Sequence, residues 1–262
     1  MIKSIKINNS EMQYATFWTW EKNFVIIPWI SMQSVLTSED ALIQVFEKFK
    51  EEYTIYIFDR LKEVPENYSI ENMAEDTKNA INKIWLSSIN LYWASQWWMI
   101  AQYMAIKYPN LIKKLILWST TSKTDENTFK IFSKRIELAK QGDKKQLAEI
   151  FAKNIYSETT IKNFWEIIKQ PILNASEEEL KKFTILASSM LYFDLKDKIK
   201  TITSKTFVIW SIKDWVFWEN ATKELAEEIN CKYYLYDWFW HAVYDEAPDF
   251  YNEKIRNFLN EE

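Results

Sequence analysis

Residues 89–107 read INLYWASQWWMIAQYMAIK. The first four are mostly apolar and are typical of a strand that is buried in a sheet. The segment from Met99 to Lys107 has the composition of a helix. Ser95 therefore falls on a short turn between a strand and a helix, where a strained backbone projects the hydroxyl from the edge of the sheet.

Strands and helices alternate on both sides of this turn. Because of this alternation, the sequence predicts an α/β fold with a doubly wound, mostly parallel sheet that opens with an antiparallel ribbon. Ser69 is expected to cap one of the helices. The predicted strands cover residues 5–8, 12–17, 24–28, 53–58, 89–92, 115–117, 206–209 and 232–236, and the main helices cover residues 41–50, 70–84, 99–107, 219–229 and 248–259.

One long segment interrupts the alternation. Residues 122–194 have helical periodicity and charged faces but no convincing strand, which indicates a helical insertion. Its large apolar side chains either line a pocket or form the insertion's own core, and the sequence leaves both open. They are Phe129, Phe132, Phe151, Phe164, Met190, Leu191 and Tyr192.

The glycine content does not fit such a fold. The chain has one glycine, Gly142, and 14 tryptophans, whereas average usage predicts roughly 18 glycines in this length. Tryptophans stand where turns need glycine, after Pro28, Asp214 and Asp237 and at Trp85, where a helix ends. We hypothesise that the gene uses UGA as a glycine codon and that UGA has been read as tryptophan. A protein naturally rich in tryptophan is the alternative.

Three residues form a candidate catalytic set. With glycine at positions 93 and 97, the turn reads Gly-Ala-Ser-Gln-Gly, the G-x-S-x-G pattern of a nucleophile elbow at Ser95; an ordinary loop serine is the alternative. His241, the only histidine of the chain, follows the last predicted strand and is the candidate base. Asp214 follows the strand at 206–209 and is the carboxylate expected to orient His241. Asp59 is the weaker alternative, and turn or capping roles are expected for Asp237, Asp245 and Glu246.

The order Ser95, Asp214, His241 resembles that of the α/β-hydrolase superfamily, and the resemblance extends over essentially the whole chain. It implies an oxyanion hole formed by the backbone N–H groups of Ile30 and Gln96. It also implies a helical cap at residues 122–195 between two parts of the core, residues 1–121 and 196–262. Other matching stretches are residues 25–29, 108–109, 209–214 and 240–241.

Two positions depart from the superfamily pattern in a way that affects the site. Tryptophan at positions 29 and 97 would fill the space where the substrate oxygen and the backbone meet. Pro28 replaces the histidine that is commoner there. The recoding hypothesis removes the first conflict, because it places glycine at both tryptophan positions.

The resemblance implies a serine hydrolase, most simply a carboxylesterase that cleaves small to medium esters through an acyl-enzyme on Ser95 without a metal or cofactor. Lactonase, thioesterase, proline-iminopeptidase-like, carbon–carbon bond hydrolase and perhydrolase activities on the same triad stay open. A serine at position 95 argues against dehalogenase or epoxide hydrolase chemistry. A non-catalytic protein that binds a ligand in the capped pocket is the alternative from another class.

Composition limits the partners and the location. The net charge is −4, and no basic block could bind a phosphate backbone, so no nucleic acid partner is expected. No apolar run approaches the roughly 18 residues of a membrane span. A single cysteine, Cys231, and a first segment without an apolar signal favour the cytoplasm. The expected partner is a small ester-type substrate, and the oligomeric state stays open.

Overall fold

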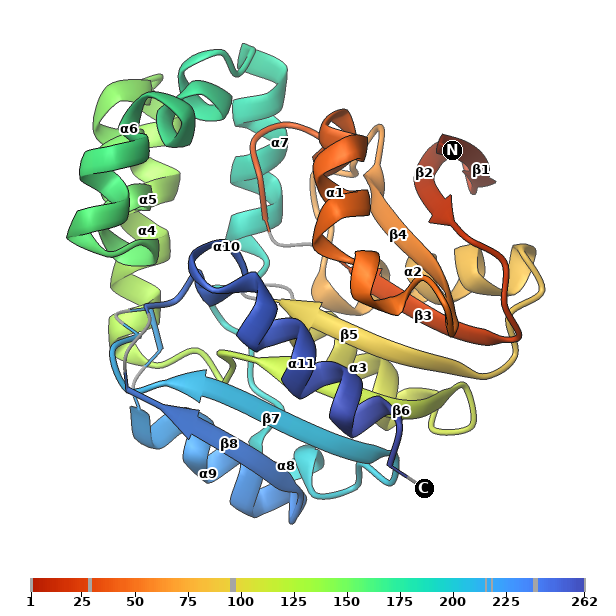
Figure 1. The fold of residues 1–262 in the computed structure, drawn as a ribbon. Coiled ribbons are helices and arrows are strands. Elements are labelled where there is room, and N and C mark those ends of the chain that lie inside the picture. The colour runs from red at the N-terminus through yellow and green to blue at the C-terminus, as the bar shows by residue number, and fades with distance from the viewer. Residues whose placement is uncertain are drawn as a thin grey trace.

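The computed structural model describes residues 2–27, 30–94, 98–214, 216–217, 219–237 and 240–261. They form an eight-stranded sheet with the order β1-β2-β4-β3-β5-β6-β7-β8 (Figure 1). The pairs β1–β2 and β2–β4 are antiparallel, and the other pairs are parallel. The strands are β1 (Ile2–Ile7), β2 (Ser10–Phe17), β3 (Lys22–Ile27), β4 (Tyr53–Leu61), β5 (Ile89–Ala94), β6 (Ile112–Trp118), β7 (Lys205–Ser211) and β8 (Lys232–Tyr236).

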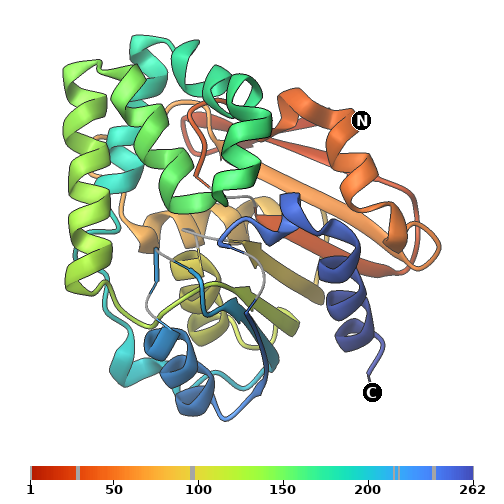
Figure 2. The same cartoon turned by 60° about the vertical axis from the view of Figure 1, so that its left-hand side comes forward.

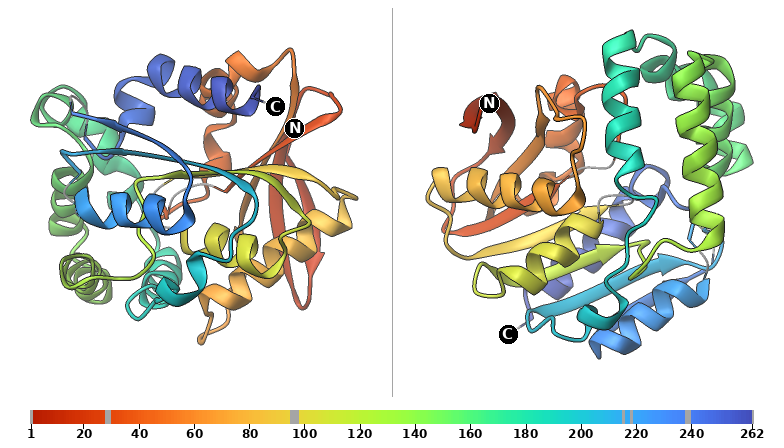
Figure 3. Two further views of the ribbon diagram at one scale, coloured as in Figure 1. Left: turned by 90° about the horizontal axis from the view of Figure 1, so that it is seen from below. Right: turned by 180° about the vertical axis from the view of Figure 1, so that it is seen from behind.

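Helices cover both faces of the sheet (Figure 3, left). Neighbouring residues of the central strands point to opposite faces, as in β6, where Leu115 and Leu117 belong to one apolar cluster and Ile116 and Trp118 to the other. The first cluster includes side chains of α2 (Ile70–Lys83), α3 (Trp98–Lys107) and α9 (Glu219–Ile229), and the second includes side chains of α1 (Glu39–Val45) and α11 (Pro248–Leu259). The predicted α/β fold with a mostly parallel sheet is confirmed.

Four helices interrupt the sheet between β6 and β7. They lie together on the side toward which the parallel strands point (Figures 1 and 2). Each begins at a residue whose side chain accepts a backbone N–H of the first turn, which stabilises the helix start. They are α4 (Glu126–Gln141), α5 (Lys144–Ile155), α6 (Glu158–Leu173) and α7 (Glu177–Ser188), capped by Asp125, Asp143, Ser157 and Ser176; the short α8 (Lys196–Ile199) follows.

The segments that enter and leave this group of helices lie side by side. Lys123 forms an isolated antiparallel bridge with Asp194. Next to it, the Leu195 N–H donates to the Ser122 carbonyl at 2.9 Å. The four helices are therefore joined to the sheet through two connecting segments of the chain that lie side by side.

Several predicted bounds differ from the observed ones, since β1 and β6, for example, begin three residues early; two other differences concern α1 and β4. The helix predicted over residues 41–50 is shorter: α1 ends at Val45, and a 3₁₀ turn at Glu47–Phe49 follows; a second 3₁₀ turn, Val35–Ser38, precedes it. β4 extends past the predicted end at residue 58 to Leu61, because Leu61 pairs with Met12 of β2. The helical periodicity of the sequence does not distinguish α1 from the 3₁₀ turns on either side of it, since such turns also bury apolar residues. The second depends on a long-range strand pair.

Trp18 and Trp85 have the left-handed backbone conformation that glycine adopts readily, with φ values of 60° and 64°. Trp85 follows the end of α2, where its N–H donates to the Asn82 carbonyl and the next N–H, of Leu86, donates to the Ile81 carbonyl. This is the Schellman end of a helix, at which glycine is strongly preferred. The Trp85 side chain is 92% exposed. Glycine would adopt the backbone conformation at these two positions without strain, and the recoding of the gene stays a hypothesis.

None of the helices within the described ranges is long and apolar enough to cross a membrane.

Candidate active site

A buried histidine–carboxylate pair lies beyond the carboxyl ends of β7 and β8. His241 Nδ1 lies 2.7 Å from Asp214 Oδ2, and only 0% and 2% of the two side chains are exposed. Asp214 comes three residues after the end of β7, and His241 comes in the segment between β8 and α10 (Val243–Glu246). Because β7 and β8 are parallel neighbours, their ends bring these two loops to the same edge of the sheet.

Asp214 is held by its own turn. Its Oδ1 accepts the backbone N–H groups of Val216 at 2.8 Å and Phe217 at 3.2 Å. This is the local turn that an aspartate side chain favours, because its oxygen can satisfy the N–H groups that follow it. One carboxylate oxygen thus fixes the loop, and the other, Oδ2, meets His241.

The loop that carries His241 is tied to the inserted helices. The Ala242 N–H donates to the carbonyl of Ile155, the last residue of α5, at 3.1 Å. Glu246, at the end of the short α10 (Val243–Glu246), accepts the Trp240 N–H at 3.3 Å. The ring of Phe217 lies 5.8 Å from that of His241, centroid to centroid.

Glu246 also reaches α6. Its Oε1 accepts the Ser157 N–H at 3.0 Å and the Thr160 hydroxyl at 2.6 Å. The adjacent Asp245 accepts the Tyr156 hydroxyl at 2.8 Å. The sequence predicts turn or capping roles for these two acids, and it does not show that they join the His241 loop to the inserted helices. Only the tertiary structure reveals this, since 86 or more residues separate the partners.

Two of the predicted site residues, Ser95 and Gln96, lie outside the described residues, as do Pro28, Trp29 and Trp97. The elements on either side are described: β5 ends at Ala94 and α3 begins at Trp98. Ile30, the other predicted oxyanion donor, is buried and follows the gap after β3. The structure thus brings together His241 and Asp214 and leaves Ser95 and Gln96 as predictions.

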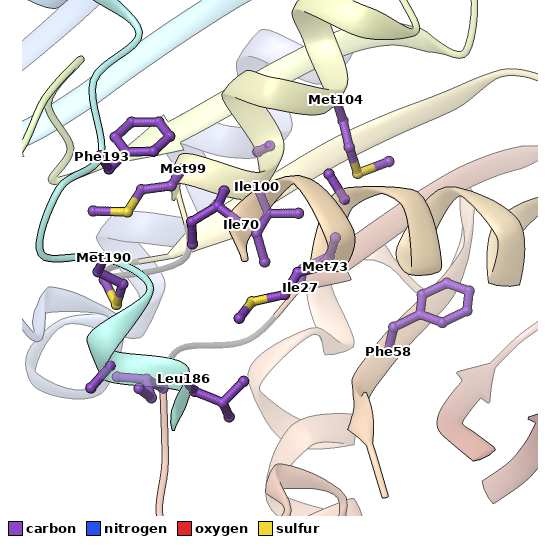
Figure 4. Close-up of a cluster of buried hydrophobic side chains, with 14 of the residues drawn as sticks. Ile27, Phe58, Ile70, Met73, Met99, Ile100, Met104, Leu186, Met190 and Phe193 are labelled. Atoms are coloured by element: carbon purple, nitrogen blue, oxygen red, sulfur yellow. The ribbon is translucent and has the colours of Figure 1, made fainter. Parts of the chain in front are cut away.

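A cluster of buried apolar side chains surrounds Met99, near the start of α3. Figure 4 shows Met99 of α3 beside Met190 and Phe193, which follow α7, with Ile70 of α2 close by. Of the large residues considered in the insertion, Met190 and Phe132 are fully buried, whereas Phe164 is 52% and Tyr192 85% exposed.

A polar pocket of about 200 Å³ lies beside Ile30. Asp59 and Arg60, at the end of β4, and Lys182 of α7 are among its lining residues. Burial lowers the pKa of Arg60 to about 10 and also lowers the pKa of Lys182. Asp59, the weaker candidate partner of His241, therefore belongs to this pocket. The sequence feature that could have indicated this pocket is the charged pair Asp59 and Arg60 near the end of an apolar strand.

No family model matches the chain. Among curated proteins it is 24% identical, over 200 residues, to a protein of Rhizobium rhizogenes strain K84 that carries the name carbamate hydrolase RutD. The match covers 75% of this chain and 76% of that protein. A protein of the same name from Agrobacterium fabrum strain C58 is 22% identical, with 75% of this chain and 77% of that protein covered.

Solved structures resemble the whole chain. An α/β hydrolase, MGS-M2, from a Medee basin deep-sea metagenome library matches with a TM-score of 0.90 at 21% identity, covering 99% of this chain and 98% of the other. The enol-lactonase of Burkholderia xenovorans LB400 matches with a TM-score of 0.86 at 13% identity, covering 99% and 100%. The esterase EaEST of Exiguobacterium antarcticum matches with a TM-score of 0.81 at 15% identity over all of both chains.

The parallel sheet, the helices inserted between β6 and β7, and the likeness to these structures agree. The chain has the α/β-hydrolase fold.

Proposed function

We propose that the protein is a serine hydrolase that cleaves small to medium carboxylic esters through an acyl-enzyme on Ser95. The observation that carries this proposal is the buried contact of 2.7 Å between His241 Nδ1 and Asp214 Oδ2. A buried imidazole whose one nitrogen is held by a carboxylate presents its other nitrogen as a base. Ser95 comes in the sequence between the end of β5 at Ala94 and the start of α3 at Trp98, outside the described residues, and in this proposal it supplies the nucleophile.

The proposed reaction proceeds in two steps. In the first, His241 Nε2 takes the proton of the Ser95 hydroxyl as its oxygen attacks the ester carbonyl, and the proton then goes to the leaving alcohol. In the second, His241 takes a proton from the water that attacks the acyl-enzyme, and it then gives this proton to the Ser95 oxygen as the bond to the acyl group breaks and the acid leaves. Asp214 keeps the Nδ1 proton in place and stabilises the imidazolium. The N–H groups of Ile30 and Gln96 bind the oxyanion in both steps.

The tryptophans at positions 29 and 97 are incompatible with this reaction, because an indole at either place would occupy the oxyanion site. The proposal therefore includes glycine at both positions in the active protein. It also includes the cap, residues 122–195, as the roof over the site.

Two forms of the full chain test the proposed function: the chain as printed, and a chain with glycine at all 14 tryptophan positions. Each is assayed with p-nitrophenyl esters, thioesters, lactones, carbamates and proline amides. We expect the glycine form to hydrolyse the short esters and to lose this activity on Ser95→Ala. Turnover of amides alone, or ester hydrolysis unchanged by Ser95→Ala, would overturn the proposal.

Carbamate hydrolysis is the second candidate, because the curated relatives carry that name. The same serine chemistry would cleave a carbamate through a carbamoyl-enzyme. A kcat/KM for a carbamate above that for the ester with the same leaving group would favour this activity.

A further inference from the structure

Arg135, on α4, is fully buried. Its guanidinium carbon lies 4.0 Å from the ring centroid of Phe151 and 5.9 Å from that of Phe132. Within the described part of the chain, the hydrogen bond recorded for the guanidinium is a long one of 3.4 Å, from Nη2 to Asn154 Oδ1, while Nε and Nη1 have no partner. The Phe151 ring covers a face of the guanidinium, and the N–H groups of Nε and Nη1, which lie in the plane, have no acceptor among the described residues.

No described carboxylate balances this charge. Burial lowers the pKa of Arg135 to about 9, and no acidic side chain opposes the shift. The buried Lys114 provides a contrast, because its ammonium donates to the carbonyls of Phe258, Leu259 and Glu261. A buried cation without a counter-ion is strongly unfavourable. Arg135 is therefore a charge for which the described residues supply no anion.

Arg135 lies on α4. This helix and its neighbour α5 each contact one of the two loops that carry Asp214 and His241. On the same face of α4, the Thr128 hydroxyl donates to the carbonyl of Val216, in the loop that holds Asp214, at 3.3 Å. The partner of Arg135, Asn154, precedes Ile155, whose carbonyl accepts the N–H of Ala242, the residue after His241. Thr128 and Arg135 are two helical turns apart, about 10 Å along the axis, and side chains on a helix lean toward its N-terminus.

We propose that Arg135 binds a carboxylate carried by the substrate, so that the enzyme prefers monoesters of short dicarboxylic acids. This inference rests on the proposed hydrolase function. A guanidinium fits a carboxylate because its planar N–H groups match the two oxygens. Arg135 lies two helical turns along α4 from Thr128, whose hydroxyl contacts the loop that holds Asp214, so the proposal places the substrate carboxylate several bonds away from the scissile carbonyl. Monoesters of succinate, glutarate and adipate provide this separation.

The kinetic test compares monomethyl glutarate with methyl pentanoate, whose acyl chain has the same number of carbons but no carboxylate. We expect the wild type to prefer monomethyl glutarate. Arg135→Met removes the charge and keeps a long apolar side chain, so it should lower kcat/KM for monomethyl glutarate by about 10- to 100-fold, mainly through KM. Methyl pentanoate should change little. Monomethyl succinate and monomethyl adipate then locate the best chain length.

Matched variants separate an anchor from a structural role. Lys134→Met removes a neighbouring charge on α4 whose ammonium is exposed and paired with Glu137, and it should leave the preference intact. Arg135→Lys keeps the charge but loses the planar fork, and it should retain only part of the preference. Equal loss on both esters in Arg135→Met would assign Arg135 to the packing of the inserted helices and overturn the proposal.

A binding measurement does not depend on hydrolysis. Glutarate should raise the melting temperature of the wild type and of Lys134→Met but not that of Arg135→Met. The melts use whichever form of the chain, with tryptophan or with glycine, hydrolyses esters. If neither form does, both are measured. If no ester is cleaved while glutarate still stabilises through Arg135, the hydrolase proposal fails and the anion site stands. If esters are cleaved without any preference for a carboxylate and glutarate has no effect, the anion site fails alone.

Discussion

Asp214 uses its two carboxylate oxygens for different purposes: Oδ2 meets His241 Nδ1 at 2.7 Å, and Oδ1 accepts the N–H groups of Val216 and Phe217. The oxygen that faces the imidazole is therefore oriented by the loop itself. In Asp214→Asn, the amide oxygen can still accept the loop N–H groups, while the amide nitrogen faces His241 and cannot accept the Nδ1 proton. Folding should survive, and ester hydrolysis should not.

We expect Asp214→Asn to lower kcat for ester hydrolysis by about 10³- to 10⁴-fold, because it favours the wrong imidazole tautomer. Steady-state assays and a thermal melt measure the two effects. Asp237→Asn, on an exposed residue after β8, is the control and should change kcat little. A similar kcat in Asp214→Asn and the control would show that this carboxylate is not part of the catalytic machinery.

Glu246 joins the His241 loop to α6 through the N–H groups of Trp240 and Ser157 and the hydroxyl of Thr160. Glu246→Gln replaces one acceptor oxygen by a donor, so it should lower the free energy of unfolding by about 1–3 kcal/mol. Amide hydrogen exchange at Ser157 should accelerate. Glu253→Gln, on an exposed side of α11, is the matched control. Unchanged exchange at Ser157 would contradict the role of Glu246.

The Tyr156–Asp245 contact has a predictable pH dependence. Part of the Asp245 side chain reaches solvent, yet burial, helped by the charge of Glu246, raises its pKa to about 6. Because this pKa lies above the ordinary value, the native state binds more protons than the unfolded state between about pH 4 and pH 6. The contribution of Asp245 to stability therefore falls as the pH rises through this window.

Asp245→Asn keeps an acceptor for the Tyr156 hydroxyl and removes the titration. Thermal melts between pH 4 and pH 6 should show a smaller loss of stability with rising pH in Asp245→Asn than in the wild type. Asp237→Asn should follow the wild type. The same pH slope in all three proteins would contradict the raised pKa.

Trp85→Gly should stabilise the chain as printed. The backbone at position 85 has a φ of 64°, and the indole is 92% exposed, so glycine relieves strain and removes little packing. We expect a gain of about 1–2 kcal/mol in the free energy of unfolding. Trp165→Gly, within the helix α6, should instead destabilise by about 1 kcal/mol or more. Denaturant titrations measure both, and a loss of stability in Trp85→Gly would contradict the glycine interpretation of this position.

Much of the fold could be predicted from patterns that act locally. The strand at 232–236 and the helices at 219–229 and 248–259 have the predicted bounds, because apolar runs, helix periodicity and a proline at the first helical turn are properties of neighbouring residues. The cap of α2 at Ser69 is confirmed for the same reason. The extension of β4 and the contacts of Glu246 depend on partners far away in the chain, which no local pattern reports.

The candidate site divides in the same way. The sequence predicts His241 because it is the only histidine and follows the last predicted strand, and it predicts Asp214 because this residue follows the strand at 206–209; the structure places the two in contact. The pocket beside Ile30 and the unbalanced charge of Arg135 could not be predicted, since the sequence shows an arginine on a helix but not which charges surround it. The roles of Ser95 and Gln96 stay predictions, because both residues fall between the end of β5 and the start of α3, outside the described part of the chain.

The proposed function requires Ser95 to be an activated nucleophile, and a fluorophosphonate, which reacts with such a serine, reports this at the residue itself. The full chain is treated with the probe, its intact mass is measured before and after, and the modified peptide is mapped. The starting mass also shows whether glycine or tryptophan occupies the 14 positions. We expect one adduct, on Ser95, in a chain with glycine at these positions, and its loss in His241→Ala. A chain that carries these glycines and forms no adduct, or forms one on another residue, would contradict the proposed function.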